Sequence, residues 1–295
     1  MTRKTTILQI AMFVFTSATF AQTQTPAART VSPGPYSVTV ESYRTLPAHT
    51  AYHPSDLNAW GGSKRLPIVS WGNGACARNG MAFATFLTQI ASHGYLAIAV
   101  GPKVVPPGPA PEPTIDDQLL LDAIDWAGRQ GDPSSPFFNK LDTTKIAVMG
   151  QSCGGLQALA VSNDPRITTT VVWNSGALPA GSTSPALKQS AGNKNSLNLL
   201  HGPVAYFIGG PSDVAYPNAE DDFARITKVP VFKGNLNVGH GGTYRQPGGG
   251  WFGEVAVAWL DYQLKGNADA AKWFVGSDCR LCKEPVWSVQ KKGTQ

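Results

Sequence analysis

The sequence predicts a single domain built on an open, mostly parallel, doubly wound α/β sheet. Three observations lead to this fold class. Short apolar runs alternate with helical patterns, several of these runs are almost continuously apolar, and 295 residues is a common length for one α/β unit. Strands such as Ile146-Ala147-Val148-Met149 are expected to be buried on both faces, which favours parallel strands covered by helices on both sides.

The expected elements follow in order along the chain. Apolar runs predict strands at 36–41, 66–70, 95–100, 145–149, 168–173, 204–208 and 229–236. Apolar residues at helical spacing predict helices at 81–92, 115–129, 153–161, 219–226 and 254–264. The segment 177–200 is rich in Ser, Pro, Asn and Gly and has no helical periodicity, so we expect a long loop over the site and no separate lid domain.

The N-terminal residues have the pattern of a signal peptide. Arg3 and Lys4 give a positive start, residues 7–20 are mostly apolar, and Thr19-Phe20-Ala21 offers a small-residue cleavage site. We therefore expect a signal peptide at 1–21, a flexible lead-in at 22–34 and one folded domain at 35–295. No other stretch approaches the roughly 18 apolar residues of a membrane span, so the mature chain is expected to be secreted or periplasmic.

Composition and charge exclude some partners. The formal charge falls from +5 to +3 when Arg3 and Lys4 are removed, and the remaining basic residues are scattered. This distribution does not form the basic patch that is typical of nucleic-acid-binding proteins. It does not indicate an oligomeric state. Charged residues make up 15% of the chain, against roughly a quarter in typical soluble domains, which indicates a loop-rich and weakly charged surface.

A possible nucleophile lies in the motif Gly150-Gln151-Ser152-Cys153-Gly154. The motif directly follows the expected strand 145–149 and opens a helix, which is the strand-turn-helix setting of a nucleophile elbow. The two glycines suit a turn that brings neighbouring backbone too close for side chains. Such a turn would raise Ser152 at the carboxyl edge of the sheet, where open α/β folds bind ligands. The alternative is an ordinary serine cap on a glycine-rich helix.

A serine hydroxyl becomes a good nucleophile only when a base takes its proton, and in this setting the order along the chain is Ser, Asp, His. This order excludes the histidines that precede the serine or the best acid, namely His49, His53, His93 and His201. His240 remains, in a glycine-flanked loop after the strand 229–236, and we expect it to be the base. The alternative is a merely exposed loop histidine.

The acid expected to orient His240 is Asp213, in the turn after the strand 204–208. There its carboxylate can accept the Nδ1 proton of the histidine and stabilise the imidazolium. Asp221 and Asp222 are rivals, but they lie on the following helix, where negative charge is ordinary dipole compensation.

Negative charge that develops on a substrate oxygen needs preorganised donors. We expect one to be the backbone N–H of Cys153. The other should come from the loop after the strand 66–70, with Asn73 as the first choice and Gly74 as the second.

Four cysteines in an exported chain make disulfides possible. Cys76 and Cys153 are each expected beside one donor loop, so we predict a disulfide between them, with two buried free thiols as the alternative. Cys279 and Cys282 form one C-x-x-C pair, which cannot fill a tetrahedral zinc site, and a short disulfide that pins the tail is favoured. No metal and no cofactor is expected.

Four aromatic residues fall in or near loops at the carboxyl edge. They are candidates for the wall of an acyl or aromatic pocket, with plain core packing as the alternative for each: Trp71, Trp173, Tyr244 and Trp251.

With these residues in place, the chain resembles the exported α/β-hydrolases that include dienelactone-hydrolase-like proteins and polyester hydrolases of the cutinase type. The matching residues span most of 65–265 and are 90–95, the 150–155 elbow, Ser212-Asp213 and Gly239-His240-Gly241. Two positions depart from the polyester group, since Cys153 replaces a methionine and Gln151 an aromatic residue or histidine. Dienelactone hydrolases themselves carry cysteine in place of Ser152.

The resemblance implies the α/β-hydrolase fold and serine ester hydrolysis. We therefore expect an exported serine hydrolase that cleaves small-molecule or polymeric carboxylic esters through an acyl-enzyme. Amide or peptide cleavage by the same triad and a non-catalytic binding protein on a hydrolase scaffold are the alternatives.

Overall fold

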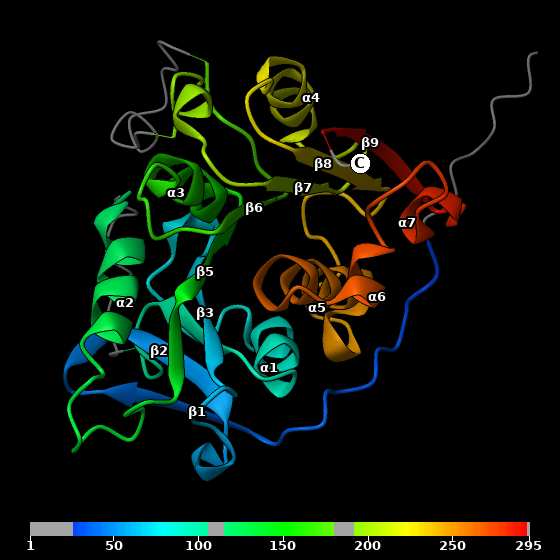
Figure 1. Cartoon of the computed structure of the whole chain (residues 1–295). Coiled ribbons are helices and arrows are strands. Elements are labelled where there is room, and N and C mark those ends of the chain that lie inside the picture. The colour runs from blue at the N-terminus through cyan, green and yellow to red at the C-terminus, as the bar shows by residue number, and fades with distance from the viewer. Residues whose placement is uncertain (1–25, 106–114, 180–191, 294–295) are drawn as a thin grey trace, which may run out of the picture.

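The structure, a computed structural model, describes residues 26–105, 115–179 and 192–293. The expected signal peptide therefore lies outside the described residues. The described strands form one sheet in the order β1-β2-β4-β3-β5-β6-β7-β8-β9 (Figure 1). Their bounds are β1 (Val38–Tyr43), β2 (Leu46–Pro54), β3 (Leu66–Gly72), β4 (Leu96–Val100), β5 (Leu141–Gln151), β6 (Thr169–Trp173), β7 (Val204–Ile208), β8 (Val231–Leu236) and β9 (Trp287–Lys292).

The central strands of the sheet are parallel. Strands β4, β3, β5, β6, β7 and β8 pair in parallel, whereas β1, β2 and β9 join antiparallel at the two ends. The prediction of a mostly parallel sheet is thus confirmed. All seven predicted strands form, with ends within four residues of the predicted ones. Strands β2 and β9 were not predicted.

Helices cover both faces of the sheet. Helices α2, α3 and α4 lie on one face, and α1, α5 and α6 lie on the other (Figure 1). The five predicted helices all form, and two short ones follow them near the C-terminus. The helices are α1 (Ala84–Ser92), α2 (Gln118–Gly128), α3 (Cys153–Val161), α4 (Tyr216–Arg225), α5 (Gly250–Lys265), α6 (Ala268–Ala271) and α7 (Arg280–Lys283).

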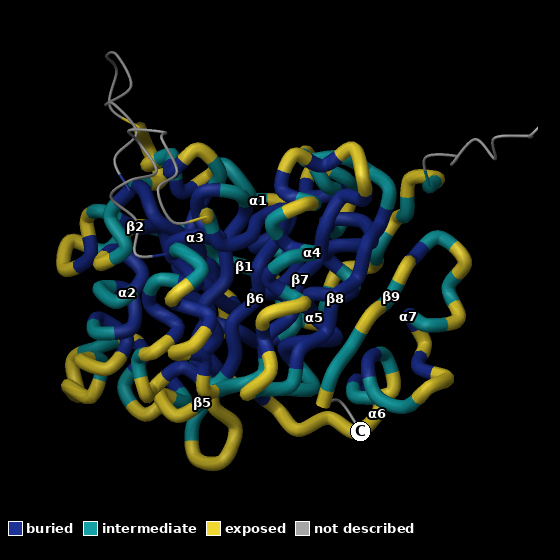
Figure 2. Tube along the Cα trace, turned by 90° about the horizontal axis from the view of Figure 1, so that it is seen from above, coloured by how far each residue is buried: buried dark blue, intermediate teal, exposed yellow. Residues whose placement is uncertain are grey.

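Strand β5 explains why both faces need cover. Its side chains alternate between two cores: Ala147 and Met149 pack with α1 and α5, whereas Ile146 and Val148 pack with α2 and α3. Burying both faces places the strand centres in the interior, and exposed residues lie mainly in the peripheral loops and turns (Figure 2). The expectation of strands buried on both faces is met by this alternation.

The described part of the expected lead-in contacts the domain. Residues 26–34 form no helix or strand, but the Arg29 guanidinium donates to Glu254 Oε1 at 2.9 Å and lies 3.8 Å from the ring centre of Trp251. The middle of the loop expected at 177–200 lies outside the described residues. No helix in the described ranges is both long and apolar enough to cross a membrane.

Candidate active site

Ser152 stands at a sharp turn between β5 and α3. Its backbone has φ 53° and ψ −116°, a conformation that residues other than glycine rarely adopt. The surrounding structure must hold the backbone in this strained conformation. A Cβ on Gly150 would lie 2.1 Å from the Gly154 carbonyl oxygen, and one on Gly154 would lie 2.0 Å from the carbonyl oxygen of Gly72. Only glycine fits at these two positions, which is the packing that a nucleophile elbow requires.

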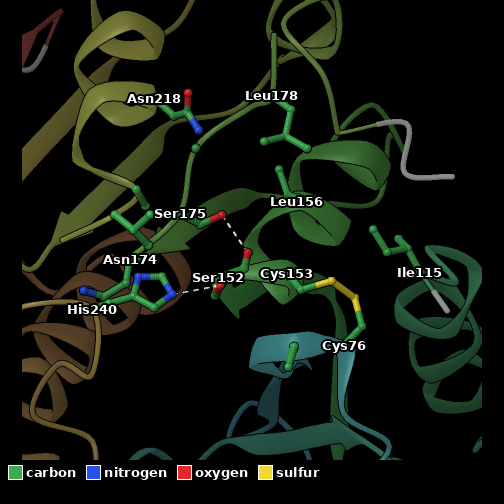
Figure 3. Close-up of a pocket in the computed structure, with 14 residues that line it drawn as sticks. Cys76, Ile115, Ser152, Cys153, Leu156, Asn174, Ser175, Leu178, Asn218 and His240 are labelled. Carbon is green, nitrogen blue, oxygen red and sulfur yellow. Dashed lines mark hydrogen bonds between the residues drawn. A yellow bond between two sulfur atoms is a disulfide. The ribbon is translucent and has the colours of Figure 1, made fainter. Parts of the chain in front are cut away.

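The structure brings the three predicted side chains into contact. Nε2 of His240 lies 2.9 Å from Oγ of Ser152 (Figure 3), and Nδ1 of His240 lies 2.6 Å from Oδ1 of Asp213. The three residues follow β5, β7 and β8, whose carboxyl ends meet at one edge of the sheet. The rivals Asp221 and Asp222 pair instead with Lys194.

Asp213 is buried but richly hydrogen bonded. Its side chain accepts from the backbone N–H groups of Gly209 and Ala215, each at 2.9 Å, and from Nδ2 of Asn174 at 2.7 Å, besides its contact with His240. Burial alone would raise the pKa of Asp213, but the hydrogen bonds outweigh it and hold the pKa below its usual value. The carboxylate is therefore ionised and able to orient the imidazole.

The Asn73 side chain faces the interior and does not reach Ser152. Its Nδ2 donates to the carbonyl oxygens of Ala77, Asn79 and Val100 at 2.8, 3.1 and 2.7 Å, and its Oδ1 accepts from Trp71 Nε1 at 3.0 Å. The side chain therefore shapes the loop, and any contribution of Asn73 to an oxyanion site must come from its backbone.

Backbone donors suited to an oxyanion lie on both sides of Ser152. Cys153 is the first residue of α3, so the helix supplies no acceptor for its N–H. Across the cleft, Ala75 lines the hollows on both sides of Ser152 and has φ 53°. Gly74 lies beside the Gln151 side chain, whose Nε2 donates to the carbonyl oxygen of His240 at 3.1 Å.

Both predicted disulfides are present. Cys76 is bonded to Cys153 across 77 residues, and Cys279 is bonded to Cys282 across three. The first bond joins the loop that contains Ala75 directly to the residue after Ser152 (Figure 3). It therefore ties together the two segments from which the oxyanion donors were expected.

An apolar cavity of about 390 Å³ opens beside Ser152. Among the described residues that line it there is no Asp, Glu, Lys or Arg and no Phe, Tyr or Trp. Its wall consists of the Cys76–Cys153 disulfide and of aliphatic, small and amide side chains, several of which surround Ser152 in Figure 3. The aliphatic side chains are Ile115, Leu156, Leu178 and Val214, with Ala75 and Ala215 beside them.

A second hollow of about 710 Å³ lies on the other side of Ser152 and His240. It is more polar, with Gln151, Arg245 and Gln246 among its lining residues. Arg245 is exposed, and no ion pair to it occurs in the described part of the chain. The two hollows share Ala75, Ser152 and His240, so one extended molecule could occupy both.

The structure does not place the four predicted aromatics on the wall of the apolar cavity. Trp71 and Trp173 have no exposed surface, and Trp251 is buried in the same core as α1 and α5. Their strand and helix positions face that core, so the core-packing alternative describes the three tryptophans. Tyr244 is also buried, at 3% exposure, but it reaches the edge of the second hollow.

Sequence reasoning missed two residues directly after β6. Asn174 contacts Asp213, and Oγ of Ser175 donates to the backbone oxygen of Ser152 at 2.6 Å. The available signal was a pair of polar residues directly after an apolar run, at the sheet edge where the site was expected.

In the described residues no group of three or more His, Cys, Asp or Glu side chains could hold a metal ion. No protein-family model matches the chain, and no curated protein matches it. The geometry of the site is therefore the basis for assigning a function.

Proposed function

We propose that the protein is an exported α/β-hydrolase that cleaves carboxylic esters through an acyl-enzyme formed on Ser152. The observation that carries the proposal is the pair of contacts at 2.9 Å and 2.6 Å that joins Ser152, His240 and Asp213. The strained turn of Ser152 between a strand and a helix, and the order Ser, Asp, His along the chain, support the fold assignment. The two disulfides are consistent with an oxidising compartment.

The contacts suggest the following sequence of steps. His240 takes the proton of Ser152 as its oxygen attacks the ester carbonyl, and Asp213 stabilises the imidazolium that forms. The N–H of Cys153 and a backbone N–H from the 73–76 loop bind the oxyanion. His240 then gives the proton to the departing alcohol. Water repeats the attack on the acyl-enzyme, which releases the acid and restores Ser152.

The lining of the apolar cavity favours an uncharged, aliphatic acyl group. Ile115, Leu156, Leu178 and Val214 offer apolar contact, and none of the lining residues that the structure describes is a Lys or Arg that could neutralise a carboxylate on the acyl chain. Burying such a charge without a partner is costly. The polar hollow across Ser152 is then available for the rest of the ester.

The decisive test compares wild type with Ser152→Ala on p-nitrophenyl acetate, butyrate, hexanoate and a monosuccinate ester. Ser162→Ala is a matched control, because Ser162 is a buried serine at the other end of α3. We expect Ser152→Ala to lose about a thousandfold or more in kcat, Ser162→Ala to stay near wild type, and the succinate ester to be the poorest substrate. Equal rates for wild type and Ser152→Ala would reject the proposed function, and a preferred anilide of the same acyl group would favour amide cleavage.

A further inference from the structure

Asn174 bridges the loops that carry the acid and the base. It lies directly after β6, has no exposed surface, and has φ 41°, in the left-handed region. Its Nδ2 donates to Oδ2 of Asp213 at 2.7 Å and to the carbonyl oxygen of Gly239 at 3.2 Å. Its Oδ1 accepts from the hydroxyl of Tyr244. Gly239 directly precedes His240, so one amide contacts both loops.

The contact with Asp213 involves the carboxylate oxygen that does not contact His240. Oδ1 of Asp213 faces the imidazole, while Oδ2 accepts from Asn174 and from the backbone of Gly209. Rotation of the carboxylate would break both sets of bonds together. Asn174 therefore limits the angle at which Oδ1 meets His240.

Tyr244 completes the set of contacts that orients the Asn174 amide. If the amide were reversed, its oxygen would face the carboxylate of Asp213 and the carbonyl oxygen of Gly239, and its NH2 group would face the tyrosine hydroxyl. Burial and the charge of Asp213 raise the pKa of Tyr244 well above its usual value, so the hydroxyl remains a donor. The two acceptors therefore set the direction of the amide nitrogen, and the hydroxyl donates to the amide oxygen in that same orientation.

We propose that Asn174 and Tyr244 form a positioning pair that fixes Asp213 and, through it, the imidazole of His240. The inference rests on the proposed function, because it assigns the pair a role in the same reaction. Asn174 borders the apolar cavity and Tyr244 the second hollow, but both are buried and their side-chain polar atoms already bond to each other, to Asp213 and to Gly239, so the pair acts through the acid. Loss of the pair should therefore lower kcat and leave KM nearly unchanged.

The first experiment removes only the tyrosine hydroxyl. Tyr244→Phe keeps a ring that packs against Phe83, Phe86 and Phe252. Tyr95→Phe is the matched control, because Tyr95 is equally buried and its hydroxyl donates to Asp261 at 2.7 Å, away from the site. We expect kcat to fall about fivefold in Tyr244→Phe, as for the loss of one neutral hydrogen bond, and to stay at the wild-type value in Tyr95→Phe.

The second experiment replaces the NH2 donor of Asn174 with a carboxyl oxygen and leaves the shape of the side chain almost unchanged. Asn174→Asp places a second carboxyl group against Asp213, and the titratable groups that face this position are Asp213, His240 and Tyr244. Two adjacent carboxylates cannot both ionise easily, so a protonated carboxyl can replace the amide donor at low pH but not at high pH. The ratio of wild-type to variant kcat should therefore grow as pH rises from about 5.5 to 8.5, reaching about a hundredfold.

A readout without turnover separates this proposal from the proposed function. A fluorophosphonate reports the nucleophilicity of Ser152, and its rate of attachment can be followed by mass spectrometry after thermal melts confirm folding. The positioning role of the pair is supported if labelling is slower in Tyr244→Phe than in Tyr95→Phe and if the ratio of wild-type to Asn174→Asp kcat grows with pH. Equal kcat and equal labelling in the two Phe variants, or a ratio independent of pH, overturns it.

Two further outcomes distinguish the proposals. If wild type is labelled at Ser152 but cleaves no ester, the proposed function fails and the labelling rates alone decide the role of the pair. If wild type is neither labelled nor active, both proposals fail. If Asn174→Asp does not fold, the more conservative Tyr244→Phe decides.

Discussion

Removal of the Cys76–Cys153 disulfide should cost far more stability than removal of the other one. In the loop-entropy model the stabilisation depends on the number of residues that the bond encloses. A loop of 77 residues corresponds to about 4.5 kcal/mol, and a loop of three to about 1.6 kcal/mol. The double variant Cys76→Ala/Cys153→Ala tests the first value, and Cys279→Ala/Cys282→Ala is the internal control.

The measurement is the thermal unfolding midpoint of both double variants against wild type. At 2 to 4 °C per kcal/mol, we expect Tm to fall by roughly 9 to 18 °C for the first pair and roughly 3 to 6 °C for the second. Ester hydrolysis well below Tm should also fall for the first pair only, because Ala75 and the N–H of Cys153 lose their covalent connection. Equal Tm losses, or a larger one for the short loop, would refute this reasoning.

Three further changes test other parts of the structure. Gly154→Ala should abolish activity and lower Tm, because its Cβ would lie 2.0 Å from the Gly72 carbonyl oxygen; normal activity with an unchanged melt would count against the elbow packing. The pKa of Asp213 is lower in the folded than in the unfolded chain, so its ionised form adds stability above about pH 4, and this is lost as pH falls through the folded pKa. In Asp213→Asn, the free energy of unfolding from urea titrations should therefore fall less than in wild type as pH is lowered. An equal fall in both proteins would contradict a lowered pKa for Asp213. Lys194→Met leaves the buried Asp222 carboxylate without its cation and should cost about 3 to 5 kcal/mol at pH 8. Because burial raises the pKa of Asp222, the cost should shrink at pH 5, and denaturant melts at both pH values check this.

The central strands could be predicted because they are buried on both faces and therefore consist mainly of apolar residues. Val204–Ile208 is buried along its whole length, and its apolar run has no other simple explanation. The two strands that were not predicted, β2 and β9, carry no such signal; β2 lies between β1 and β4, and β9 is the last strand of the sheet, next to β8. Leu46–Pro54 contains two histidines and two prolines. Four of the six residues of Trp287–Lys292 are polar, and in the described sheet this strand pairs on one side only. In both of these strands, pairing with neighbouring strands decides strand formation more than composition does.

In the candidate site too, some residues could be predicted from the sequence, whereas the role of others depends on tertiary contacts. Ser152, Asp213 and His240 could be selected because the chemistry demands three residue types in a fixed order, and that order leaves few candidates. Asn174 could not be selected, since its importance depends on the neighbours that tertiary structure brings to each end of its amide. The tryptophans illustrate the opposite difficulty, because Trp71 and Trp173 lie near the site in sequence but their side chains face the core.

The predicted Cys76–Cys153 disulfide and the Asn174 amide, which was not predicted, connect different pairs of loops. The Cys76–Cys153 bond joins the loop after β3 to the turn at Ser152, and so concerns the proposed donors for the oxyanion. The Asn174 amide joins the Asp213 loop to the His240 loop, and so concerns the proposed base. Neither connection follows from local backbone preference, since each spans segments far apart in the sequence. A site assembled from four separate loops needs such ties, because reacting groups that drift by about 1 Å lose much of their rate.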